Sequence, residues 1–162
     1  MAKAKWNDDG LAQFIASLEK TDDRDIEEIA GSAIYAMANE VANQVKANLE
    51  GLATSTEKKY KDNHVRLITP RQKAGLIASF GISKMREYGT EWNVKLGFDG
   101  YNDVITETYP NGQANTMVAR LTESGSTWRQ KQPFFRPALN ASKDRAKKAG
   151  EQKAIEKLKE KY

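Results

Sequence analysis

The sequence contains no cysteine among its 162 residues and only one histidine, His64. The absence of cysteine excludes disulfide frameworks and thiolate chemistry, and a single histidine cannot build the common zinc sites. A Ser-His-Asp triad could only form around His64, and no serine stands in a nucleophile-elbow context. Glycine-rich phosphate-binding motifs are also missing. We therefore expect no catalytic site, cofactor or metal, and a protein that is not an enzyme.

Long apolar runs are missing as well. No segment approaches the roughly 18 apolar residues that a membrane span requires, and the basic N-terminus, MAKAKWNDDG, lacks the apolar core of a signal peptide. Hydrophobic residues make up 39% of the chain and charged residues 30%, which is too apolar for a disordered chain. We expect a soluble protein without membrane contact, with one domain in 1–150 and a charged helical extension in 151–162.

The charges are distributed unevenly. Residues 1–30 hold eight acidic and four basic side chains, a net charge of −4, whereas residues 141–162 hold four acidic and eight basic ones, a net charge of +4. In a monomer this is surface patterning. In a ring of identical copies it would favour head-to-tail contact between neighbours.

Apolar periodicity predicts three helices. A short helix is expected at 9–20. A long one is expected at 24–49, because apolar residues recur there at three- and four-residue steps, with Asp22 or Asp23 as a cap and Gly51 just past the end. The last helix runs to the C-terminus with sparse apolar positions, and its final two turns are expected to project or to await a partner.

Residues 51–74 show no periodicity and are rich in bases, which predicts an exposed basic loop that could order on docking. The candidate docking residues in this segment are Lys58, Lys59, Tyr60, Lys61, Arg66 and Arg71.

After this segment the apolar residues recur at every second position. Phe80 and Ile82 alternate with polar neighbours, and alternation resumes from Trp92 to Phe98 after a turn at 88–90. This pattern is typical of a β-hairpin with one buried face. Val104 and Ile105 allow a further short strand.

Residues 115–124 favour a short helix that is capped by Asn115 and ends at Gly125, although their alternation also permits a strand. Together these elements predict an α+β fold, with a small antiparallel sheet packed against a long helix, a short N-terminal helix and a C-terminal helix.

The segment Pro133-Phe134-Phe135-Arg136-Pro137 is the most unusual feature. It cannot lie inside a helix, because Pro137 would break it, but it can begin one. One interpretation is an apolar staple that ties the last helix to the sheet. The other is that a ring or the guanidinium of this segment contacts a neighbouring subunit.

Three motifs carry a resemblance to a known family: T-P-x-x-x-x-G-L-x-x-S at 69–79, A-R-L-T-E-S-G-S at 119–126 and P-F-F-R-P-A-L at 133–139. In this order, after a long alanine-rich helix, they resemble the tail-completion or head–tail joining proteins of tailed bacteriophages, typified by the gene-ten product of a lambdoid siphophage. The resemblance spans about residues 9–150, and Gly125 and 133–137 match its motif.

The resemblance implies a structural virion protein of the neck or tail end, assembled in the host cytoplasm. It would form a ring, commonly of six copies or matched to the connector, and would join the tail to the head. Its partners would be itself, the tail tube or terminator proteins and the head connector, with genome DNA passing through the channel unrecognised. The main role of Gly125 and residues 133–137 would be to anchor the last helix. Their secondary role would be to contribute to a subunit interface.

A small basic DNA-binding protein is the alternative. The basic loop and the basic C-terminal helix could provide an electrostatic footprint for nucleic acid. However, the lysines are interleaved with glutamates, and no helix-turn-helix or aromatic stacking sheet can be traced.

Overall fold

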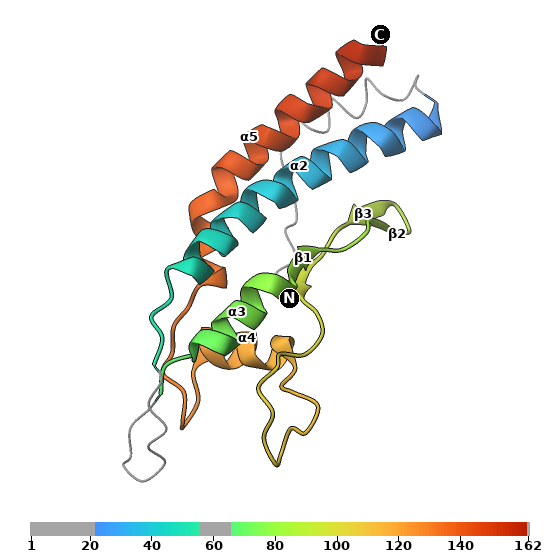
Figure 1. The fold of residues 1–162 in the computed structure, drawn as a ribbon. Coiled ribbons are helices and arrows are strands. Elements are labelled where there is room, and N and C mark those ends of the chain that lie inside the picture. Colours follow the sequence, from blue (N-terminus) through green and yellow to red (C-terminus); the bar gives the residue numbers. More distant parts are fainter. Residues whose placement is uncertain (1–21, 56–65, 162) are drawn as a thin grey trace.

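The computed structural model describes residues 22–55 and 66–161 (Figure 1). Two long helices, α2 (Asp23–Glu50) and α5 (Phe135–Lys161), lie side by side. The other described elements are α3 (Pro70–Ser79), β1 (Phe80–Ile82), β2 (Arg86–Tyr88), β3 (Glu91–Asn93), β4 (Leu96–Phe98) and α4 (Asn115–Ser124). The fold is α+β, with small antiparallel sheets beside a long helix, as predicted. The helix expected at 9–20 lies outside the described residues.

Helix α2 matches its predicted span closely, and Asp22 caps its start by accepting a hydrogen bond from the Arg24 amide at 3.3 Å. Its end differs from the expectation, because Gly51 keeps a right-handed φ of −79°. The Lys73 ammonium takes over part of the C-terminal capping: it donates to the carbonyls of Glu50 at 2.6 Å and Leu52 at 3.0 Å. A cation is favourable at this end of the helix dipole.

Helix α5 approaches α2 closely because its buried positions are small. They recur every four residues: Ala138, Ser142, Ala146, Gly150 and Ala154. At Gly150 a Cβ atom would lie 2.5 Å from Met37 Cγ and 3.4 Å from the Ala33 carbonyl oxygen. The small side chains let the two helices pack over much of their length without large apolar residues, which explains why so polar a helix is stable here.

Substituting Gly150 with valine should destabilise the protein by about 1–2 kcal/mol, because overpacking a close helix contact costs more than the added helix propensity returns. Urea denaturation followed by circular dichroism measures the change. Ala141→Val, on the exposed face of α5, is the matched control and should have a much smaller effect. A Gly150→Val protein as stable as the control would contradict the close approach.

The C-terminal end of α5 packs on the molecule, so the prediction that its final turns project is wrong. Ala154 and Ile29 form a second, small apolar cluster, against which Leu158 and Ile26 also pack. The helix continues to Lys161 beside the start of α2. Ala154 and Leu158 face a matching stripe on α2, which the sequence alone did not reveal, whereas Ile155 is exposed.

The predicted hairpin is present with its turn at Gly89, where φ is +63°. It is interrupted in the middle: β1 pairs with β4, placing Phe80 opposite Phe98, and β2 pairs with β3 nearer the tip. The Tyr35 hydroxyl of α2 accepts a hydrogen bond from the Met85 amide at 2.8 Å and so ties the interrupted region to the helix.

The strand allowed at Val104 and Ile105 does not form. These residues lie in a long loop that Asn102 organises, because its side-chain oxygen accepts hydrogen bonds from the amides of Val104 at 3.1 Å and Gln113 at 2.9 Å. An asparagine that bonds its own backbone two residues on favours a turn over a strand.

The exposed loop predicted at 51–74 is wrong at Ile68, which is buried in the main core, and over 70–74, which belong to α3. Thr69 and Gln72 form a reciprocal capping box, with both bonds at 3.2 Å, and Pro70 occupies the first helical turn. Proline is favourable there because its missing amide needs no partner. The local capping signal was present in the sequence, but the weak apolar pattern of this segment concealed it.

Helix α4 forms as favoured and ends at Gly125. Asn115 does not cap it, because Ala114 holds the capping position and the buried Asn115 side chain donates instead to the Asp99 carbonyl at 2.9 Å. The main core lies where α2, α3, α4, β1 and the start of α5 meet. Its buried members are Ala42, Val45, Leu49, Ile68, Leu76, Phe80, Val118, Ala119, Phe134 and Ala138.

Candidate docking interface

The two motif segments at 119–126 and 133–139 are joined through Glu123. Its carboxylate accepts hydrogen bonds from three consecutive amides at the start of α5: Oε2 from Phe134 at 2.8 Å and Phe135 at 2.9 Å, and Oε1 from Arg136 at 3.0 Å. The first amides of a helix lack intrahelical partners, and a carboxylate there is also favoured by the helix dipole. The last turn of α4 therefore caps α5.

Gly125 allows the chain to reverse between the two helices. Its φ is +75°, and a Cβ atom there would lie 3.0–3.2 Å from three atoms of Lys131. The Gln132 amide then donates to the Thr122 carbonyl at 2.8 Å, which closes the reversal. A left-handed conformation with so little space explains why glycine suits this position.

The phenylalanine pair has the stapling role that was one of its two interpretations. Phe134 is 1% exposed, and its ring meets that of Phe98 edge-on at 5.9 Å between centroids. Phe135 is half-buried and meets Phe80 edge-on at 6.3 Å. Both rings thus tie α5 to the sheet.

The other members of the motif segment lie at the surface. Pro133, Arg136 and Pro137 are exposed, and Pro137 falls in the first turn of α5, where proline is tolerated. An interface role for this segment stays a prediction for these three residues. Phe134 is excluded from direct contact by its burial in the folded chain.

The candidate docking loop is only partly described. Lys58, Lys59, Tyr60 and Lys61 lie outside the described residues. The other two candidates, Arg66 and Arg71, are placed apart from one another: Arg66 lies next to the α4–α5 connection, whereas Arg71 is on α3.

Arg71 forms an exposed ion pair with Asp103 at 2.9 Å. A hydrogen bond from its guanidinium lowers the pKa of the Asp103 carboxyl below its usual range. Arg71 thereby fastens the long loop 99–113 to α3, which is a structural use of a residue that the sequence suggested for docking.

Residues 126–130, which we name the Trp128 turn, form a hydrogen-bonded protrusion in the α4–α5 connection. The Ser126 amide donates to the Arg129 carbonyl at 2.9 Å, and the Trp128 amide donates to Ser126 Oγ at 3.3 Å. The backbone of Arg66 braces the turn by donating to the Trp128 carbonyl at 3.1 Å and accepting from the Gln130 amide at 2.8 Å. The indole of Trp128 is nevertheless 71% exposed.

Arg129 is the half-buried base of this turn. Its guanidinium donates to the Leu67 carbonyl at 3.2 Å and to Gln72 Oε1 at 3.0 Å. Burial lowers the pKa of Arg129, and the nearby charge of Arg66 lowers it further. Residues of the turn and its neighbours line an open depression: Ser124, Gly125, Ser126, Arg129, Gln130 and Lys131.

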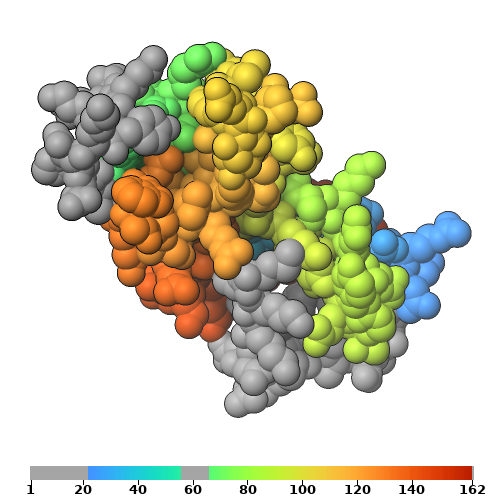
Figure 2. All heavy atoms as spheres, turned by 90° about the horizontal axis from the view of Figure 1, so that it is seen from below, coloured from blue at the N-terminus to red at the C-terminus, as the bar shows by residue number. Residues whose placement is uncertain are grey.

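The loop 99–113 and the Trp128 turn are both visible on the face shown in Figure 2. The loop exposes Tyr101 by 70% and Ile105 by 71%. Sequence reasoning missed Trp128, Tyr101 and Ile105, because exposure depends on tertiary packing; the only signal was a tryptophan in a segment without apolar periodicity.

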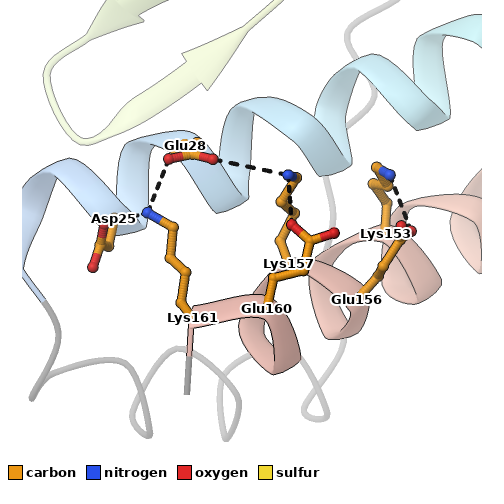
Figure 3. Close-up of polar contacts among 7 residues, drawn as sticks. All are labelled: Asp25, Glu28, Lys153, Glu156, Lys157, Glu160 and Lys161. Carbon is orange, nitrogen blue, oxygen red and sulfur yellow. Dashed lines mark hydrogen bonds and ion pairs between the residues drawn. The ribbon is translucent and has the colours of Figure 1, made fainter.

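The acidic and basic ends of the chain pair with each other (Figure 3). Lys161 contacts Asp25 and lies 2.9 Å from Glu28, and Lys157 lies 3.9 Å from Glu28 and 2.7 Å from Glu160. At these residues the acidic and basic ends of the sequence therefore form ion pairs within one chain. This weakens the argument that the uneven charge distribution favours contact between neighbouring copies.

The ion pairs of Lys161 should stabilise this end of the helix pair in a pH-dependent way. Hydrogen bonds to Asp25 and Glu28 raise the pKa of Lys161 above its usual value. The stabilisation is therefore complete below the ordinary lysine pKa of about 10.4 and is lost as the pH rises through the higher pKa of the folded state. The melting temperature of the wild type should exceed that of Lys161→Gln at pH 8. The difference should shrink in strong alkali and in 1 M salt; a difference that is unaffected by either would contradict an ionic origin.

Two further structural findings concern the described residues alone. No helix within 22–55 or 66–161 is long and apolar enough to cross a membrane. In the same part of the chain no group of three or more histidine, aspartate or glutamate side chains is placed to hold a metal ion.

Comparisons with known proteins add no relative. No protein-family model, no curated protein and no solved structure matches this chain. The candidate interface therefore rests on the motifs and the geometry described above.

Proposed function

We propose that this chain is a structural virion protein of a tailed bacteriophage, which forms a ring at the neck or tail end and joins or completes the tail at the head connector. The observation that carries the proposal is the Glu123 cap. The two most specific motifs of the resemblance are separate in sequence, and Glu123 of the first holds the backbone of the second at three amides. The resemblance thus rests on residues that form one structural joint.

The surface around this joint supports a docking role. The Trp128 turn lies in the connection between the two motifs and exposes its indole, and Arg136 and the two prolines are exposed at the start of α5. A fixed joint with exposed side chains suits a protein whose work is complementary contact, because a preorganised surface loses little conformational entropy on binding.

The DNA-binding alternative receives less support from α5. Its basic residues are partly neutralised by their own neighbours, since Lys153 lies 3.0 Å from Glu156 and Lys157 lies 2.7 Å from Glu160 (Figure 3). Phosphate binding depends on free positive charge that displaces counterions.

Light scattering on the purified protein, alone and mixed with isolated tails of the virus that encodes it, tests the proposal. We expect a ring in solution or, in images of the mixture, added density at the head-proximal end of the tail. A protein that stays monomeric and does not associate with tails would contradict the proposal. If it then bound DNA with an affinity that fell steeply with salt, the alternative would replace it.

A further inference from the structure

The Trp128 turn is an unusual place for a tryptophan. Five backbone and side-chain hydrogen bonds, within 126–130 and to Arg66, hold the turn in one conformation. The conformation does not serve to bury the indole, which remains 71% exposed. Tryptophan is the residue type most enriched at the energetic centres of protein interfaces, because it buries a large rigid surface at a small cost in entropy.

The charged side chains of the Trp128 turn and its immediate sequence neighbours have one sign. Residues 125–132 contain Arg129 and Lys131 but no acidic residue, and Arg66 lies against the turn. Within the described part of the chain, no carboxylate forms an ion pair with Arg129. Its guanidinium is already half desolvated, so a carboxylate placed beside it by a partner would gain attraction at a reduced desolvation cost.

Charge complementarity identifies the class of partner. Asp25 and Glu28 at the start of α2 are already paired with Lys157 and Lys161, so these two carboxylates of a second copy are poor partners for the turn. The chain as a whole is also basic, with a net charge of +4. An acidic surface on a different protein fits better.

The shape of the turn argues against nucleic acid. Proteins that bind single strands combine a basic groove with several aromatic stacking residues. Here a single indole stands on a narrow protrusion beside an open depression. A protrusion with one anchor residue matches insertion into a pocket of a protein partner.

We propose that the Trp128 turn is the anchor by which this protein docks onto a different protein, inserting Trp128 into an apolar pocket rimmed by carboxylates that face Arg129 and Lys131. The inference rests on the proposed function in one respect: the partner protein is taken to be part of the assembled tail. It assigns the docking contact to residues outside both the phenylalanine pair and the basic loop that the sequence suggested.

Binding to isolated tails tests this inference. Cosedimentation of the full-length protein with tails gives an apparent Kd for the wild type and for three variants. We expect Trp128→Ala to weaken binding at least about tenfold, as for a central anchor residue, and Trp128→Phe to retain part of the affinity. Tyr88→Ala is the matched control, because Tyr88 is also an exposed aromatic residue, 52% exposed, but lies on the hairpin. It should bind as the wild type does.

The other outcomes are distinguishable. Equal binding by wild type and Trp128→Ala would overturn this inference and leave the proposed function standing, whereas a wild type that does not bind tails would overturn both. If Trp128→Ala binds tails normally but no longer self-associates, the turn contacts a second copy and the inference is overturned. If it binds tails normally but loses affinity for single-stranded DNA, the turn binds nucleic acid and the inference is likewise overturned. Circular dichroism and thermal melting check that each variant is folded, and the exposure of the Trp128 side chain predicts little change.

Discussion

Replacing Phe134 with alanine should lower the free energy of unfolding by about 3–5 kcal/mol, the cost of truncating a fully buried phenylalanine. The ring is 1% exposed and packs edge-on against Phe98 at the centre of the main core. The surrounding residues come from α2, α3, α4 and the sheet, so the cavity cannot collapse without moving several elements. Urea denaturation monitored by far-UV circular dichroism measures the loss.

Phe135→Ala is the matched control for this substitution. It removes the same ring from the next position, but that ring is only half-buried, so the loss should be clearly smaller. If both variants lost the same stability, or if Phe134→Ala lost less than about 1 kcal/mol, then Phe134 would not be the staple that the structure describes. Its predicted role in a subunit interface would then regain support.

Glu123→Ala should destabilise the protein by about 2–4 kcal/mol. The substitution removes a charged acceptor from three amides at the start of α5. Losing an ordinary helix cap, which serves a single amide, costs about 1 kcal/mol, so the loss of this cap should cost more. Glu123→Gln keeps the shape and an acceptor oxygen but loses the charge, so its loss should be intermediate. Chemical denaturation of the three proteins gives the order.

Hydrogen exchange adds a local test of the same contact. The amides of Phe134, Phe135 and Arg136 should exchange faster in Glu123→Ala than in the wild type, beyond the change expected from the lower global stability. Unchanged exchange at these amides would show that the carboxylate does not cap them in solution, whatever the change in stability.

These two variants also separate folding from docking. Phe134 and Glu123 stabilise the joint between α4 and α5, whereas Trp128 protrudes from that joint and packs on little. We therefore expect stability to depend on the first two residues and association with tails to depend on the third. This division explains how one short connection can be both a structural staple and a docking surface.

The long helix, the hairpin turn and the helix at 115–124 could be predicted from the sequence because their signals are local. The apolar stripe of α2 repeats over many turns, and the glycines at 89 and 125 adopt the positive φ that their turns require. Helix α3 also had a local signal, the capping box of Thr69 and Gln72, but few apolar residues accompany it. The basic composition around it favoured a loop instead.

Only the tertiary structure decided the rest, because the deciding contacts join residues that are far apart in the chain. Alanine, serine and glycine on α5 carry no strong apolar signal, and they become core residues only because α2 lies close enough to touch them. Likewise, the sequence alone indicates a solvated charge at Lys161, and only the fold shows that Asp25 lies beside it.

The candidate interface shows the same division. The sequence by itself determined that the 133–137 segment cannot lie inside a helix and can begin one, because Pro137 is tolerated only in the first turn. It could not show which rings are buried, that Glu123 caps that helix, or that the backbone of Arg66 braces a turn which leaves Trp128 exposed. Burial and exposure are set by which elements pack together, and that is a property of the whole fold and not of any one segment.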